Sequence, residues 1–85
     1  MREDASERAE RYLVTTSAAL KQLKSKKLPG RVSESSLQHV LELVHGYVKD
    51  AKHYAENGKP VTSLACIAYA EGLLDAAKFL ELVEF

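Results

Sequence analysis

Three histidines and one cysteine are the residues best suited to metal binding or nucleophilic chemistry in this sequence. His39, His45 and His53 lack the three- or four-residue spacing that brings two imidazoles to one metal on a helix. Cys66 has apolar neighbours and no nearby base to activate it. We therefore expect surface histidines, an inert buried thiol, and no metal, cofactor or catalytic site. His39 and His53 share one side of a predicted helix with Asp50, so a partner-binding edge is the alternative there.

Two carboxylates one helical turn apart, Glu71 and Asp75, form an unusual pair because the segment around them is strongly apolar. Like charges at this spacing repel each other, and burial adds a desolvation cost unless a partner compensates. Lys78 lies on the same narrow polar strip and is the simplest partner. We interpret Glu71, Asp75 and Lys78 as a structural polar cluster. A small-ligand site at the two carboxylates is the alternative.

Five basic residues and no acidic one occupy residues 21–31: Lys21, Lys24, Lys26, Lys27 and Arg31. Such a basic corner could bind the phosphate groups of a nucleic acid. Lysines also collect at helix C-termini because the helix dipole favours them there, and no aromatic residue is interleaved to stack a base. Solvation of a helix end is the favoured interpretation, and a nucleic-acid-binding accessory protein is the alternative.

The composition limits the possible partners and compartments. Twelve basic and twelve acidic residues among 85 give a formal net charge of zero, so no overall field attracts nucleic acid or an anionic membrane. A single cysteine excludes an internal disulfide and is typical of a reducing compartment. No apolar run reaches the roughly 20 residues of a membrane span, and the charged start MREDASERAE is not expected to be a signal peptide. We expect a cytoplasmic protein without a membrane partner.

Hydrophobic periodicity predicts three helices, over residues 3–27, 33–57 and 60–83, within one domain spanning residues 1–85. Ser33 is the predicted N-cap of the second helix, Asn57 and Gly58 end it, and Pro60 suits the first turn of the third. Short connections favour antiparallel neighbours, which predicts an all-α, up-down-up three-helix bundle. No segment alternates in the manner of a strand, so no β-sheet is expected.

The third predicted helix, PVTSLACIAYAEGLLDAAKFLEL, is apolar on two sides. We expect the first side to face the core: Val61, Leu64, Ala65, Ala68, Gly72, Ala76, Phe79 and Val83. Three small residues on this side, Ala68, Gly72 and Ala76, should allow a close helix crossing. The positions predicted to be most buried are Leu13, Leu20, Val40, Val44, Val48, Ala68, Gly72 and Ala76.

The second apolar side of this helix is expected to point partly outward. It carries Ile67, Ala70 and Leu74, and Phe85 extends it. We predict that these four residues form the interface of a homodimer related by a two-fold axis. In the alternative, the first two helices bury this side within one chain.

Part of the sequence resembles a known family. The run YVKDAKHY at residues 47–54, the turn at Asn57 and Gly58, and AYAEGLLDA at residues 68–76 are similar to the archaeal domain of unknown function 357, over about residues 33–82. The resemblance implies a small, cytosolic, archaeal helical protein and transfers no catalytic residue. We therefore expect a non-enzymatic protein-interaction or scaffold module that associates with itself or with another protein.

Overall fold

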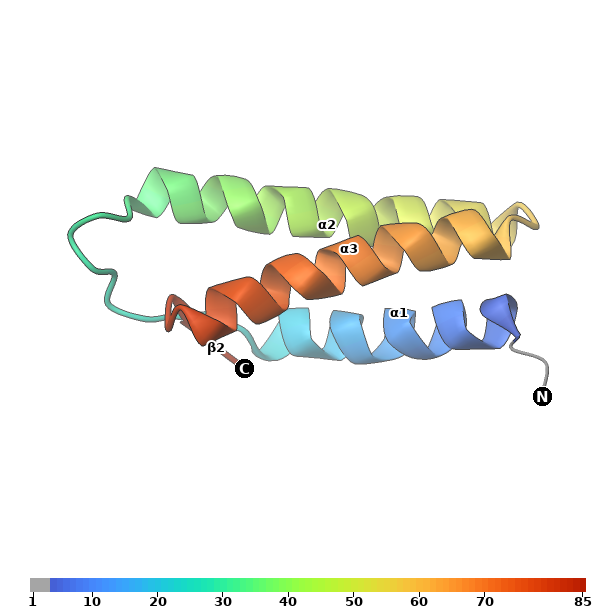
Figure 1. Ribbon diagram of the computed structural model, residues 1–85, viewed down its shortest axis with the longest axis horizontal. Helices are drawn as coiled ribbons and strands as arrows, with labels where there is room; N and C mark the ends of the chain where they lie inside the picture. Colours follow the sequence, from blue (N-terminus) through green and yellow to red (C-terminus); the bar gives the residue numbers. More distant parts are fainter. Residues whose placement is uncertain (1–3) are drawn as a thin grey trace.

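The computed structural model describes residues 4–85, which form an antiparallel bundle of three helices closed at one end by a short pair of strands. The elements in chain order are α1 (Ala5–Gln22), β1 (Lys24–Ser25), α2 (Glu34–Glu56), α3 (Pro60–Phe79) and β2 (Val83–Glu84). Helix α3 packs against both α1 and α2, whereas α1 and α2 contact each other less (Figure 1). The predicted all-α, up-down-up three-helix bundle is confirmed.

The helices begin where residues suited to helix N-termini occur. The Asp4 carboxylate accepts a hydrogen bond from the backbone N–H of Ser6 at 3.0 Å, which fixes the start of α1. The Ser33 hydroxyl accepts one from the N–H of Ser36 at 3.1 Å, so the predicted N-cap of α2 is confirmed. Helix α3 begins at Pro60, as predicted, without a side-chain cap.

Helix α2 ends in a hydrogen-bonded turn known as a Schellman motif. The backbone N–H of Lys59 donates to the carbonyl of Tyr54 at 2.9 Å, and that of Gly58 donates to the carbonyl of Ala55 at 3.4 Å. This turn needs a residue with positive φ, and Gly58 supplies it at 70°. The Asn57–Gly58 pair therefore ends α2 as the sequence predicts.

Helix α3 ends in the same motif but without a glycine. The N–H of Leu82 donates to the carbonyl of Ala77 at 2.9 Å, and the N–H of Glu81 donates to that of Lys78 at 3.0 Å. Glu81 takes the left-handed conformation, with φ at 60°, although its Cβ disfavours it. The chain reverses here, so residues 82–85 turn back along the end of the bundle.

The predicted ends of the first and third helices, at residues 27 and 83, are therefore wrong, and so is the expectation of no strand. Beyond α1, Lys24 pairs with Glu84 and Ser25 with Val83 in an antiparallel register. The N–H of Lys26 also donates to the carbonyl of Leu82 at 3.0 Å. This path buries Leu82 and Val83 against the core and gives residues 24–26 backbone partners.

The core lies mainly between α2 and α3. Its buried residues are Leu37, Leu41, Val44, Val48 and Ala51 of α2, Ile67, Ala70, Leu74 and Ala77 of α3, and Leu82 and Val83 of the tail. The prediction of buried Val44 and Val48 is confirmed, whereas Leu13, Leu20 and Val40 are only half-buried. Helix α1 contributes two buried residues, Ala9 and Thr16, and a row of half-buried ones.

The predicted orientation of α3 about its axis is wrong. The expected outer residues Ile67 and Leu74 are buried, whereas the expected core residue Phe79 is 79 % exposed. Both sides of α3 are apolar, so periodicity alone could not choose between them. The branched side chains of Ile67 and Leu74 remove more apolar surface from water at the middle of the bundle than alanine and glycine would, which favours the observed orientation.

The expected burial of Ala68, Gly72 and Ala76 is wrong for the same reason. All three are exposed, so no helix in the described part of the chain crosses α3 closely at these residues. Apart from its neighbours and the backbone of its own helix, a Cβ atom added at Gly72 would meet no heavy atom within 4 Å. Within residues 4–85, Gly72 therefore has no role in packing another helix.

A buried serine joins α3 to α2. Ser63 has no exposed surface, and its hydroxyl donates a hydrogen bond of 2.6 Å to the carbonyl oxygen of Ala51. The bond leaves no unpaired polar atom on the buried side chain. It also fixes the N-terminal half of α3 along α2.

Replacing Ser63 with alanine removes its buried hydrogen bond to Ala51 and leaves the Ala51 carbonyl without this donor. We expect Ser63→Ala to lower the free energy of unfolding by about 1 kcal/mol, measured by urea denaturation. Thr62→Ala is the matched control, because Thr62 is the exposed neighbour, and it should change stability by less than about 0.5 kcal/mol. Equal effects of the two substitutions would contradict a stabilising role for the Ser63 bond.

Glu81 and Gly58 occupy the same positive-φ position in the two Schellman turns, so substitutions at these two residues should change stability in opposite directions. Glu81→Gly should raise the free energy of unfolding by about 0.5–1 kcal/mol, because glycine adopts positive φ without strain. The larger conformational entropy of glycine in the unfolded chain offsets only part of this stabilisation. Gly58→Ala should lower the free energy of unfolding by about 1 kcal/mol. Thermal denaturation of both variants tests the pair, and a destabilised Glu81→Gly protein would refute the strain at this turn.

Candidate interaction surface

The large apolar side chains that remain exposed lie mostly on the side of the bundle formed by α3. Among residues 4–85 they are Val14, Leu43, Val61, Tyr69, Phe79 and Leu80. Val61, Tyr69 and Phe79 belong to α3, and Leu80 is its C-cap residue. Four of the six therefore belong to one helix and its C-terminal cap. The exposed side of α3 therefore has more large apolar side chains than any other described surface of the molecule, which is typical of an interaction site.

The outer face of α3 is the side directly opposite the core. At about 100° per residue it consists of Val61, Ala65, Ala68, Gly72, Ala76 and Phe79, and all six are exposed. None of them is polar. The acidic residues Glu71 and Asp75 lie beside this face, toward α1. An exposed helix in a soluble bundle normally carries polar side chains opposite the core, so α3 departs from that pattern.

Two glycines in helix interiors lie on open surface, Gly46 in α2 and Gly72 in α3. Relative to alanine, a glycine in a helix interior costs about 1 kcal/mol. Among residues 4–85, apart from the chain neighbours and the backbone of the same helix, no atom lies within 4 Å of the position of a Cβ at either residue, so packing in this part of the chain does not explain these glycines. An open helical glycine allows another backbone to approach closely.

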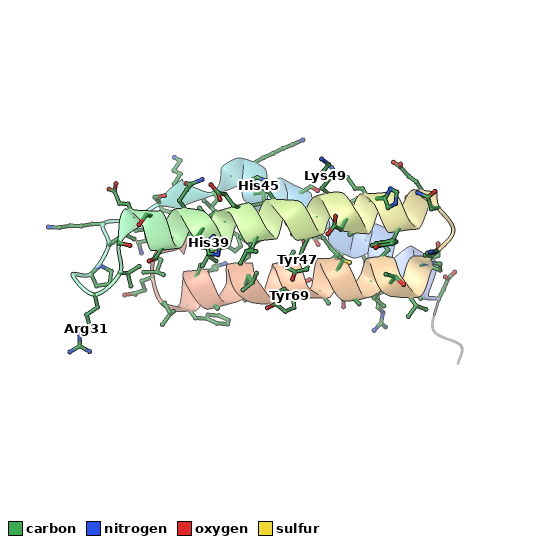
Figure 2. The ribbon with its side chains drawn as sticks, turned by 90° about the horizontal axis from the view of Figure 1, so that it is seen from above. Arg31, His39, His45, Tyr47, Lys49 and Tyr69 are labelled. Carbon is green, nitrogen blue, oxygen red and sulfur yellow. The ribbon has the colours of Figure 1, made fainter. Side chains whose placement is uncertain are left out.

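Aromatic side chains line the seam between α2 and α3. The rings of Tyr47 and Tyr69 lie with their centroids 4.6 Å apart and their planes tilted by 41°. Figure 2 shows both tyrosines and His39 along this seam, with His45 and Lys49 on the opposite side of α2. A shallow cavity of about 300 Å³ lies beside the tyrosines and is lined by His39, Glu42, Leu43, Gly46, Tyr47 and Asp50.

A second cavity lies between the N-terminal half of α2 and the C-terminal half of α3. Its volume is about 180 Å³, and it borders the outer face at Ala76 and reaches the C-cap residue Leu80. We call it the apolar cavity, because its lining is almost entirely aliphatic: Val32, Ser36, Leu37, Val40, Leu73, Ala76, Ala77, Leu80 and Leu82. It forms a hollow at one end of an otherwise continuous apolar surface.

The predicted interface residues do not form this surface. Ile67, Ala70 and Leu74 are in the core, and Phe85 is half-buried against it. The predicted interface on these residues is therefore wrong, because the first two helices cover that side of α3 within one chain. A substitution such as Leu74→Glu would place a charge in the core.

The histidines are exposed, as predicted. Rings of His39, His45 and His53 lie on different parts of α2, and the His53 ring contacts the edge of Tyr54 with centroids 5.3 Å apart. In the part of the chain that the structure describes, no group of three or more His, Cys, Asp or Glu side chains could hold a metal ion.

The predicted polar cluster is only partly formed. Glu71 and Asp75 are half-buried and line one cavity of about 160 Å³ between α1 and α3, together with Thr15, Thr16, Ala19, Leu74 and Phe85. The Lys78 ammonium lies over the Phe85 ring, 4.6 Å from its centroid. Lys78 therefore contacts an aromatic ring, which the sequence did not predict. Half-exposure leaves both carboxylates solvated, so they do not require a buried partner.

The basic corner is exposed around the end of α1 and the connection to α2, with Arg31 at its tip (Figure 2). The fold brings one acidic residue to the corner from far away in the sequence, and a second lies just after the corner in the sequence. Glu84 faces Lys24 across the strand pair, and Glu34 lines a cavity of about 290 Å³ with Lys26. The corner is therefore less positive than the sequence alone indicates.

The single cysteine is half-buried at the α2 side of α3. Burial raises the pKa of the Cys66 thiol, and the negative charge of Asp50 raises it further. The thiol is therefore protonated at neutral pH, which makes it a poor nucleophile. The expectation of a buried cysteine is wrong, because Cys66 is only half-buried.

Three antiparallel helices without a metal-binding cluster in residues 4–85 define a small all-α protein whose distinguishing feature is an apolar helix face. The chain belongs to the family described as Protein of unknown function (DUF357), whose sequence model matches residues 11–83. The predicted family resemblance is thus confirmed. No curated protein and no solved structure matches the chain. None of the helices in the described residues has the length and hydrophobicity needed to cross a membrane.

The raised pKa of Cys66 predicts slow alkylation. A higher pKa means less thiolate at a given pH, so the rate of reaction with iodoacetamide should rise at a higher pH than for a small free thiol. Asp50→Asn should move this rise to lower pH, because it removes one of the two causes. Glu42→Gln is the control and should leave the profile unchanged. A wild-type profile at or below that of the small thiol would contradict the assignment.

Proposed function

We propose that the protein is a small helical interaction module that self-associates, with the outer face of α3 as the contact between two copies. The observation that supports this proposal is the exposed apolar surface from Val61 to Phe79. Phe79 is 79 % exposed and Val61 is 71 % exposed, and neither side chain has a polar atom that would need a partner on burial. Contact with a second copy would remove both side chains from water.

The size of the face supports a reversible dimer. Helix α3 has 20 residues. It is therefore about 30 Å long, and with a width of about 10 Å its outer face covers about 300 Å² in projection. Leu43, Tyr69 and Leu80 extend the apolar surface toward α2. Stable interfaces bury about 800 Å² of accessible surface per partner, so the outer face alone is smaller than a stable interface and suits a weak, reversible contact.

The chemistry of the face disfavours other kinds of partner. Phosphate groups need cations, and the outer face has no charged side chain. Helices that lie on anionic membranes carry lysine and arginine along the polar side, whereas the polar strip of α3 holds Glu71 and Asp75 with Lys78 alone. A second copy supplies an apolar face of the same length. Nucleic-acid binding at the basic corner stays the alternative, and it would leave the α3 face uncovered.

Phe79→Glu tests the proposal because it places a charge at the most exposed apolar position of the face. We expect wild type to dimerise in sedimentation equilibrium and Phe79→Glu to dissociate at least about tenfold more readily, since an unpaired charge is costly to bury. Val14→Glu is the matched control: Val14 is similarly exposed, but it lies on α1. Circular dichroism should show all three proteins equally helical.

Two results would overturn the proposal. One is a wild-type protein that stays monomeric at millimolar concentration. The other is a dimer that Val14→Glu weakens as much as Phe79→Glu does. A salt-dependent mobility shift with RNA, lost when Lys26 and Lys27 are replaced by glutamine, would instead favour the nucleic-acid alternative.

A further inference from the structure

We infer that the cavity of about 160 Å³ between α1 and α3 binds a primary ammonium group carried on a short aliphatic chain. This site is separate from the proposed contact between two copies and does not depend on it. Three side chains that can accept hydrogen bonds line the cavity without a partner among residues 4–85: the carboxylates of Glu71 and Asp75 and the hydroxyl of Thr16.

The Thr16 hydroxyl distinguishes this cavity from a solvated acidic patch. Thr16 is 3 % exposed, and its hydroxyl forms no hydrogen bond within the described residues. The neighbouring Thr15 hydroxyl, in contrast, donates to the carbonyl of Tyr12 at 3.2 Å. No fully buried side-chain oxygen in this part of the chain lacks a partner, so the Thr16 hydroxyl keeps a small accessible surface, which opens on the cavity that Thr16 lines. Buried hydroxyls normally have partners, so this one points to a bound group.

The carboxylates of Glu71 and Asp75 supply the negative charge of the site. Each residue is half-buried, and neither forms an ion pair or a hydrogen bond with another described residue. Lys78 follows Asp75 by one helical turn, but its ammonium lies over the Phe85 ring and pairs with neither carboxylate. Like charges at a four-residue spacing repel each other, so a bound cation would relieve a repulsion that the chain itself leaves in place.

The lining of the cavity favours an alkylammonium over a metal ion. An ammonium group has three N–H donors, and two carboxylates and a hydroxyl can accept all of them. The apolar side chains of Ala19, Leu74 and Phe85 complete the lining and suit an alkyl chain. A hard divalent cation prefers about six oxygen ligands, and these apolar side chains provide none.

The volume of the cavity limits the length of the ligand. A water molecule occupies about 30 Å³ in the liquid, so a cavity of about 160 Å³ has room for about five groups of that size. A butylammonium ion fits this space. The lysine side chain has the same alkyl chain and the same ammonium group, so a free amine and a lysine of another protein share the required chemistry.

Titration with n-butylammonium chloride, followed by NMR of the backbone amides, tests the site. We expect saturable shifts at Thr16, Glu71 and Asp75, with a Kd in the millimolar range because the ligand is small. Glu71→Gln and Asp75→Asn should each weaken binding at least about tenfold, since each removes a charged hydrogen-bond acceptor. Asp50→Asn is the matched control: it removes a carboxylate beside a different cavity, on α2, and should bind like wild type.

Thr16→Val separates ligand binding from a role in folding, because it keeps the shape of the side chain and removes the hydroxyl. The hydroxyl has no partner in the described chain, so the melting temperature without ligand should be unchanged or higher. The affinity for butylammonium should fall at least about threefold. A lower melting temperature with unchanged affinity would show that the hydroxyl acts only within the fold, and it would overturn the inference.

Two further probes distinguish the sources of the ligand and the competing cation. Nα-acetyllysine methylamide that binds as tightly as butylammonium would indicate a lysine of another protein, whereas binding of butylammonium alone would indicate a free amine. Magnesium chloride that causes the same shifts and displaces butylammonium at equal concentration would show a general cation site and overturn the inference. Absence of saturable shifts at Glu71 and Asp75 would also overturn it, while leaving the proposed self-association unaffected.

Discussion

The packing of the middle of α3 between the other two helices is the constraint on which the rest of the structure depends. Ile67 and Leu74 fill the space that α1, α2 and α3 share, and the Ser63 hydroxyl ties the start of α3 to Ala51 of α2. Once these side chains are inside, the rotation of α3 is fixed. The opposite side, from Val61 to Phe79, must then face away from the bundle. The exposed apolar face therefore follows directly from how the core is filled.

Much of the fold could be predicted from the sequence because it depends on local signals. A serine at position 33, the Asn57–Gly58 pair and Pro60 act through their own backbone preferences and side-chain hydrogen bonds, so they place the ends of α2 and the start of α3 correctly. The rotation of α3 could not be predicted in this way. It depends on which apolar side chains fill a space defined by three helices, and hydrophobic periodicity carries no information about that space.

The end of α3 was missed for a related reason. A Schellman turn is normally announced by glycine, but here Glu81 adopts the left-handed conformation because the tail that follows is buried and paired. The candidate site likewise combines features that the local sequence predicts with features that depend on the folded chain. Exposed histidines could be recognised from their spacing. The contact of Lys78 with Phe85 depends instead on the chain reversal at Glu81, and the pairing of Lys24 with Glu84 depends on contact between distant segments. Only the fold brings Phe85 to Lys78, or Glu84 to Lys24.

The uneven packing of the helices has a consequence for how the bundle opens. Helices α2 and α3 are joined by a tight turn and share most of the fully buried residues, so they form a local unit that can assemble early. Helix α1 meets this unit mainly through half-buried side chains, and the β1–β2 pair connects its end to the C-terminal tail (Figure 1). Amide hydrogens of α1 should therefore exchange with solvent through local opening, while those in the middle of α2 and α3 exchange only when the whole bundle unfolds. The pairing of β1 with β2, which has only two residues in each strand, must also break if β1 separates together with α1.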